Sequence, residues 1–147
     1  MPSRFQLPPI AKAAERLLVD IENAVRGFSV YHRHKIGGDL RTQAMTVYRV
    51  ACRAWRDRAQ QQRWVEDLRW AIDELKQHLQ IAKLLHAFKS FRQFEELARQ
   101  AHGLGAQSGG WCKKFETPNA QNAQGGNAIV QRGKKLSTPA ASTGANP

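Results

Sequence analysis

The chain has 147 residues and a formal net charge of +11, with 23 lysines and arginines against 12 aspartates and glutamates. This length suits one domain with its own hydrophobic core. Such a surplus is typical of proteins that bind an anionic polymer, an anionic membrane surface or an acidic protein, although a soluble basic protein is also compatible with it. No stretch approaches transmembrane length and the N-terminus lacks a signal-peptide pattern, so we expect a cytoplasmic protein with no membrane partner.

The positive charge is concentrated in one part of the sequence. Residues 26–63 contain nine basic residues and only two acidic ones, Asp39 and Asp57, which gives a local net charge of +7. Clustering of this kind favours a binding surface over a uniformly solvated one.

Apolar residues that recur with the period of an α-helix predict four helical segments. The first begins after Pro8 and Pro9, which suit an opening turn, and ends at Gly27. A basic loop over residues 32–35 is expected to follow it.

The second segment is predicted to begin near Asp39, an N-cap candidate, and to run to about Gln60. Arg49, Arg53 and Arg56 fall within about 60° of each other on this helix, opposite its apolar face. We call these three residues the arginine row. The predicted core face comprises Leu40, Ala44, Val47, Ala51 and Ala54, and it continues through Tyr48 and Trp55.

The third segment is predicted from about Arg63 to Phe88. A second apolar strip on its opposite side, Trp70, Ile81 and Leu84, is interpreted as an oligomer interface, the alternative being scattered surface hydrophobes. Its predicted core stripe is Trp64, Leu68, Ala71, Ile72, Leu75, Leu79 and Ala82.

Ser90 and Gln93 form a capping-box pattern that opens the fourth segment. Its glycines, among them Gly105, imply either close approach to a neighbouring helix or an early end. From residue 116 onward small and polar residues predominate, which predicts a disordered tail. We therefore expect an all-α protein with a short arm (1–7), an antiparallel up-down four-helix bundle (8–115) and a disordered C-terminal tail (116–147).

The sequence offers no constellation of residues typical of an active site. His32 and His34 lack a third metal ligand, and Cys52 and Cys112 lack metal-ligand spacing. No phosphate-cradling loop and no nucleophile with its base are evident. We expect a protein that is not an enzyme and that carries no metal or cofactor.

The basic residues are therefore the functional candidates. Arg69, Lys76 and Lys83 repeat every seven residues along the third segment. Together with the arginine row, this second row could track a phosphate backbone from adjacent helices. The alternative is a pair of solvated helix faces with ordinary i,i+4 pairing, for which Arg69 and Asp73 are suited.

Three segments resemble the four-helix-bundle family that includes Avd, the accessory variability determinant of diversity-generating retroelements, and bundle proteins encoded in rRNA intervening sequences. Residues 28–37 (FSVYHRHKIG) are similar to the family's F-P-x-x-H-R-[aromatic]-T-[aliphatic]-G loop, and residues 68–83 to its third helix. Gly105 followed by residues 109–113 (GGWCK) is similar to its closing signature. The resemblance covers roughly residues 5–115.

This resemblance implies a basic homopentameric barrel of four-helix bundles, with Trp70, Ile81 and Leu84 between subunits. It also implies association with a reverse transcriptase and binding of its template RNA or RNA–DNA hybrid, in support of mutagenic cDNA synthesis. Two alternatives stay open, an RNA-associated protein of the rRNA intervening-sequence type and a helical scaffold that docks an acidic protein. The predicted nucleic-acid-binding residues are Arg33, Arg41, Arg49, Arg53, Arg56, Arg69, Lys76, Lys83 and Lys113. Among these, the family motif singles out Arg33, Arg69 and Lys113.

Overall fold

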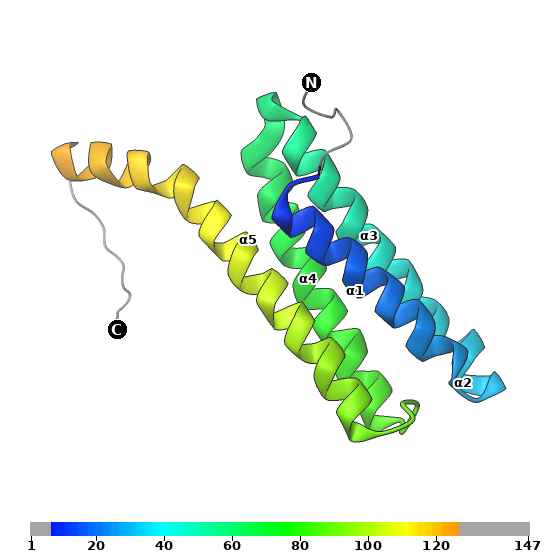
Figure 1. The fold of residues 1–147 in the computed structure, drawn as a ribbon. Helices are drawn as coiled ribbons and strands as arrows, with labels where there is room; N and C mark the ends of the chain where they lie inside the picture. Colours follow the sequence, from blue (N-terminus) through cyan, green and yellow to red (C-terminus); the bar gives the residue numbers. More distant parts are fainter. Residues whose placement is uncertain (1–6, 127–147) are drawn as a thin grey trace, which may run out of the picture. The chain divides into compact units, whose positions relative to one another are not determined.

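A computed structural model of the chain describes residues 7–126, with side chains described for residues 7–115. Within this range all regular structure is helical and no strand occurs. Two short elements accompany the long helices, α2 (Val30–His34) and the 3-10 turn η1 (Arg58–Gln60). The prediction of an all-helical protein with four long helices is confirmed. These helices are α1 (Pro9–Arg26), α3 (Ile36–Arg56), α4 (Gln61–Leu84) and α5 (Phe91–Gly126) (Figure 1).

The chain divides into two compact units, Met1–Cys112 and Lys113–Pro147. In the second unit the described residues, 113–126, are helical. Residues 116–126 of the predicted tail therefore belong to α5, which is a difference from the expected disorder. The rest of that tail, 127–147, and most of the predicted arm lie outside the described residues.

Within Met1–Cys112 the apolar stripes of the four long helices share one core. α1 lies beside α3, and α4 lies between α3 and residues 91–112 of α5 (Figure 1). Polar side chains tie neighbouring helices together at the rim. Gln43 of α3 donates to the carbonyl of Ala71 on α4 at 2.9 Å, and Gln100 of α5 donates to Asp20 of α1 at 2.8 Å. Periodicity predicted these buried α3 and α4 residues correctly: Leu40, Ala44, Val47, Ala51, Ala54, Leu68, Ala71, Ile72, Leu75, Leu79 and Ala82.

The connection between α1 and α3 is helical, and the predicted basic loop at 32–35 is wrong. The hydroxyl of Ser29 accepts a hydrogen bond from the N–H of His32 at 3.3 Å and thereby caps α2. The following helix begins at Ile36, so Asp39 is in its first turn and is not its N-cap. Ile36 and Gly37 are buried against the end of α1, and a Cβ at Gly37 would stand 2.8 Å from Val25 Cγ1. Tertiary packing, rather than a capping side chain, sets this helix start.

The C-terminal ends of α3 and α4 also differ from the predicted boundaries. α3 ends at Arg56, short of Gln60, because Asp57 opens η1 and accepts the N–H of Gln60 at 3.3 Å. α4 ends at Leu84 and does not reach Phe88, since His86 adopts a positive φ of 58°.

This left-handed residue completes a helix-ending motif. The N–H of His86 donates to the carbonyl of Lys83 at 2.9 Å and that of Ala87 to the carbonyl of Ala82 at 3.0 Å. These two bonds satisfy carbonyls that the end of a helix leaves without partners.

The capping box at the start of α5 is confirmed. Ser90 Oγ accepts the N–H of Gln93 at 3.2 Å, and Gln93 Oε1 accepts the N–H of Lys89 at 3.1 Å. α5 continues through Gly105, where an added Cβ would stand 2.9 Å from Lys76 Nζ. The early end of the helix is therefore not observed at this glycine, and its nearest neighbour is the flexible end of a lysine side chain. Within residues 7–126, a helix that could span a membrane is not found.

Candidate nucleic-acid interface

The arginine row lies on the exposed face of α3, opposite the buried stripe. Arg49, Arg53 and Arg56 line a groove of about 610 Å³, together with Tyr48 on the same helix and Trp64 on α4. The lining also includes Leu7, Glu15 of α1, and Val50 and Cys52 of α3. The predicted row is therefore one wall of a concave surface, which we call the arginine groove.

One arginine of this groove is held in place by an aromatic ring. The guanidinium carbon of Arg53 lies 5.2 Å from the centroid of the Trp64 ring, within the range of cation–π attraction. The indole N–H of Trp64 in turn donates to Asp57 Oδ2 at 3.0 Å. Trp64, predicted to be a core residue, is only half-buried, with its ring against Arg53 and its indole N–H bonded to Asp57.

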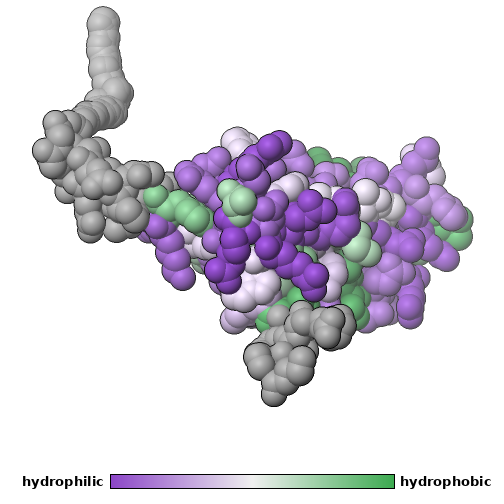
Figure 2. Space-filling model, turned by 90° about the horizontal axis from the view of Figure 1, so that it is seen from above, coloured by the Kyte–Doolittle hydropathy of each residue, from purple (hydrophilic) through white to green (hydrophobic). Residues whose placement is uncertain are grey.

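A second arginine and tryptophan pair lies at the connection between α3 and α4. The guanidinium carbon of Arg58 lies 5.3 Å from the centroid of the Trp55 ring. Trp55, also predicted to be in the core, is 40% exposed. Ala54, in the last turn of α3, is buried as predicted, whereas Trp55 beside it stays partly in solvent. Figure 2 shows this end of the first unit from above, with a surface dominated by hydrophilic side chains.

The arginine groove keeps an excess of positive charge. Among the residues with described side chains, ion pairs join Arg16 to Asp20, Arg41 to Glu22 and Arg99 to Glu96, and none involves the arginine row. The one acid in the groove lining, Glu15, accepts a hydrogen bond from the Tyr48 hydroxyl at 3.0 Å. That hydrogen bond, together with burial, raises the pKa of Tyr48 to about 12.

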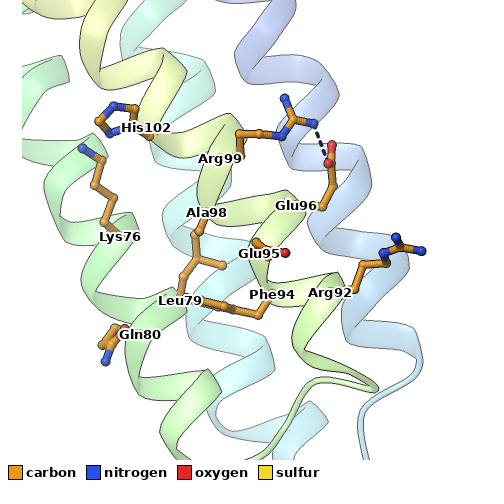
Figure 3. Close-up of a pocket in the computed structure, with 10 residues that line it drawn as sticks. All are labelled: Lys76, Leu79, Gln80, Arg92, Phe94, Glu95, Glu96, Ala98, Arg99 and His102. Atoms are coloured by element: carbon orange, nitrogen blue, oxygen red, sulfur yellow. Dashed lines mark hydrogen bonds and ion pairs between the residues drawn. The ribbon is translucent and has the colours of Figure 1, made fainter.

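The second predicted row lies on a different face. Lys83 Nζ is 4.9 Å from the ring centroid of Phe94 on α5, whereas the opposite flank of α4 contacts α3 through Glu74 and Gln43. Figure 3 shows Lys76 beside α5 in a separate groove of about 680 Å³, which Arg99 and His102 also line. Lys76 and Lys83 therefore lie toward α5, apart from the arginine groove, and Arg69 is exposed. A helical wheel gives the angle of a residue but not the identity of the neighbouring helix.

The remaining predicted basic residues are dispersed. Arg33 is exposed on α2, at the opposite end of the first unit from the connection of α3 to α4 (Figure 1). Arg41 pairs with Glu22 through a contact of 2.7 Å and lines a shallow groove next to Arg49. Lys113 is exposed and belongs to the second unit.

The apolar strip on the outer face of α4 is exposed, as expected from its position opposite the core stripe. Trp70, Ile81 and Leu84 are 68%, 47% and 59% exposed. Hydrophobic side chains that share one face and stay in solvent are typical of an interaction surface.

Among the described residues, no group of three or more histidine, cysteine, aspartate or glutamate side chains is placed to hold a metal ion. The chain matches no protein-family model, no curated protein and no solved structure. The geometry of the arginine groove is therefore the main guide to function.

Proposed function

We propose that this chain is a non-catalytic, cytoplasmic accessory protein of a diversity-generating retroelement. In this proposal it binds template RNA or RNA–DNA hybrid through its basic surface and associates with the reverse transcriptase. The observation that carries the nucleic-acid part is the arginine groove, in which Arg49, Arg53 and Arg56 line one concave surface and none forms an ion pair with a described acid.

Guanidinium groups arranged in this way suit phosphate oxygens. Arginine presents several N–H donors in a planar fork and keeps its charge at all relevant pH values. Contacts to phosphate give affinity and register but carry no sequence information. The groove therefore accounts for binding to a phosphate backbone, while selection of one particular RNA requires other contacts.

We further propose that the four long helices form an antiparallel up-down bundle that assembles into a homopentamer, as the family resemblance implies. The exposed side chains of Trp70, Ile81 and Leu84 support this assembly, because burial between subunits would remove their apolar surface from water.

The nucleic-acid proposal is tested by fluorescence anisotropy with a labelled structured RNA and a labelled RNA–DNA hybrid over a range of salt concentrations. Replacement of Arg49, Arg53 and Arg56 together by glutamate should abolish binding at physiological salt, with unchanged helicity by circular dichroism. The milder variant, with glutamine at all three positions, should make the negative slope of log K against log salt shallower by about 2 to 3. Each lost phosphate contact contributes about 0.7 to 0.9 to the steepness of this slope.

The matched control is a triple glutamate variant at Lys12, Arg26 and Arg92, which are exposed outside the groove. It changes the net charge by the same amount, so it should weaken binding far less. Equal losses in the two glutamate variants would contradict a site at the groove and indicate an effect of net charge alone.

Association with a reverse transcriptase is tested separately by co-purification of the tagged full chain with the enzyme encoded beside it. Recovery of a reverse transcriptase supports the retroelement role. RNA binding without the enzyme favours a protein of the rRNA intervening-sequence type, and absence of any RNA binding favours the scaffold that docks an acidic protein.

A further inference from the structure

Two tryptophan rings, each with a guanidinium group against it, occur within one short stretch of chain. Trp55 pairs with Arg58 at 5.3 Å, and Trp64 pairs with Arg53 at 5.2 Å, both measured from guanidinium carbon to ring centroid. The two pairs flank the connection between α3 and α4, and Arg53 and Trp64 also line the arginine groove. We call Trp55, Arg58, Trp64 and Arg53 the Arg–Trp cluster.

A purely phosphate-binding surface does not require exposed aromatic rings. An indole face attracts a nucleobase as well as a guanidinium, and each base stacked on an aromatic side chain contributes about 1–3 kcal/mol by alanine substitution. Paired bases inside a duplex have their faces covered by neighbouring base pairs. A stacking surface therefore acts on unpaired bases only.

We propose that the Arg–Trp cluster is a stacking site for unpaired nucleobases, so that the bound nucleic acid is single-stranded where it meets the connection between α3 and α4. The inference rests on the proposed function, because it names the form of nucleic acid that the arginine groove holds. Arg53 and Trp64 share the groove with Arg49 and Arg56, and Arg56 is next to Trp55 in the sequence, so cationic side chains are available for the phosphates that join those bases. Trp55 and Arg58 themselves lie outside the groove lining.

The two rings have different surroundings and therefore different roles. Trp55 is 40% exposed, and no hydrogen bond from its indole N–H is found within the described residues, so it is the stacking platform. Trp64 is half-buried and its indole N–H is bound to Asp57. Its ring positions Arg53 at the mouth of the groove instead of offering a free surface.

The test uses the full chain and two labelled probes with equal numbers of phosphates, a single-stranded oligoadenylate and an RNA duplex. The unmodified protein should bind the single strand more tightly than the duplex. Trp55→Leu, which keeps apolar bulk and removes the aromatic face, should weaken single-strand binding about 5- to 150-fold, since 1.4 kcal/mol corresponds to a factor of ten. The duplex affinity and the salt slope of Trp55→Leu should stay unchanged. The single-strand affinity of Trp55→Phe should lie between that of Trp55→Leu and that of the unmodified protein.

Tyr31→Leu is the matched control. Tyr31 is an exposed aromatic residue on α2 outside the arginine groove, and its ring contacts His32 and no described arginine. This variant should leave both affinities unchanged.

The possible failures are distinct. If neither probe binds the unmodified protein at low salt, the proposed function itself fails. If both probes bind but Trp55→Leu leaves the single-strand affinity unchanged, or lowers both affinities equally, the stacking site is overturned and the arginine groove stands.

Discussion

The hydroxyl of Tyr48 on α3 donates a hydrogen bond to the carboxylate of Glu15 on α1 at 3.0 Å. Both residues line the arginine groove, so this bond ties α1 to α3 at the rim of the candidate site. It also occupies the one carboxylate that lines the groove with the arginine row. The pair therefore links the stability of two helices to the electrostatics of the binding surface.

Removal of this hydrogen bond should change how stability depends on pH. The pKa of Tyr48 is raised from 10.0 to about 12, so the folded state favours the neutral phenol. The resulting stabilisation is fully present below about pH 10, the pKa of an unperturbed tyrosine, and is lost as the pH rises through the folded pKa. Urea unfolding between pH 8 and 12 should show the free-energy advantage of the original protein over Tyr48→Phe shrinking above about pH 10. A constant difference across this range would contradict the pairing.

Two adjacent glycines at the start of α3 should respond oppositely to alanine. At Gly37 an added Cβ would stand 2.8 Å from Val25 Cγ1 and 3.0 Å from the carbonyl oxygen of His32, whereas at Gly38 nothing lies within 4 Å. Gly37→Ala should destabilise the protein, because an overpacking cost of about 1–3 kcal/mol outweighs a helix-propensity gain of about 1 kcal/mol. Gly38→Ala should stabilise the protein, because alanine has the higher helix propensity and its Cβ meets no neighbouring atom there. Thermal melts of the two variants measure the contrast, and a stabilised Gly37→Ala would show that α1 and α3 are less closely packed.

Glycine at position 86 should stabilise the end of α4. His86 has a φ of 58°, a left-handed conformation that costs a residue with a Cβ about 1–2 kcal/mol. His86→Gly relieves that cost, so the melting temperature should rise by a few degrees. His78→Gly, which changes the same residue type inside α4, should instead lower it by a comparable amount. A lower melting temperature for His86→Gly would contradict the helix-ending motif at His86.

Polar substitutions in the apolar strip should dissociate the proposed oligomer. Trp70→Gln combined with Ile81→Gln removes apolar area from the outer face of α4 without touching the buried core stripe. Light scattering should then report a smaller mass than for the original protein. Val19→Gln on the exposed face of α1 removes a hydrophobe elsewhere and should leave the mass unchanged. If the double variant keeps its mass, the strip is not the subunit interface.

Features determined by neighbouring residues in the sequence were predictable. The period of apolar residues located the core stripes of α3 and α4, because burial continues along a helix with the same period. The capping pattern of Ser90 and Gln93 was equally readable, since a capping box involves residues three apart.

Features that depend on tertiary contacts were not predictable. Trp55 and Trp64 continue the apolar periodicity, yet the first is 40% exposed although its neighbour Ala54 is buried, and the second is bound to Asp57 across the connection. α3 begins at Ile36 because that residue and Gly37 pack against α1, which no local pattern reveals. Lys76 and Lys83 lie toward α5, and this too could not be predicted because it depends on which helix packs beside α4.

The chain of contacts from Asp57 through Trp64 to Arg53 bears on the thermodynamics of binding. A long side chain that is ordered only when its ligand arrives loses about 0.5–1.5 kcal/mol of rotamer freedom at that moment. Arg53 rests on a ring whose orientation is already fixed by a hydrogen bond of 3.0 Å, so much of its freedom is lost when the protein folds. An anion that reaches Arg53 meets a side chain already in position, and its binding is opposed by a smaller loss of entropy than binding to a mobile surface lysine.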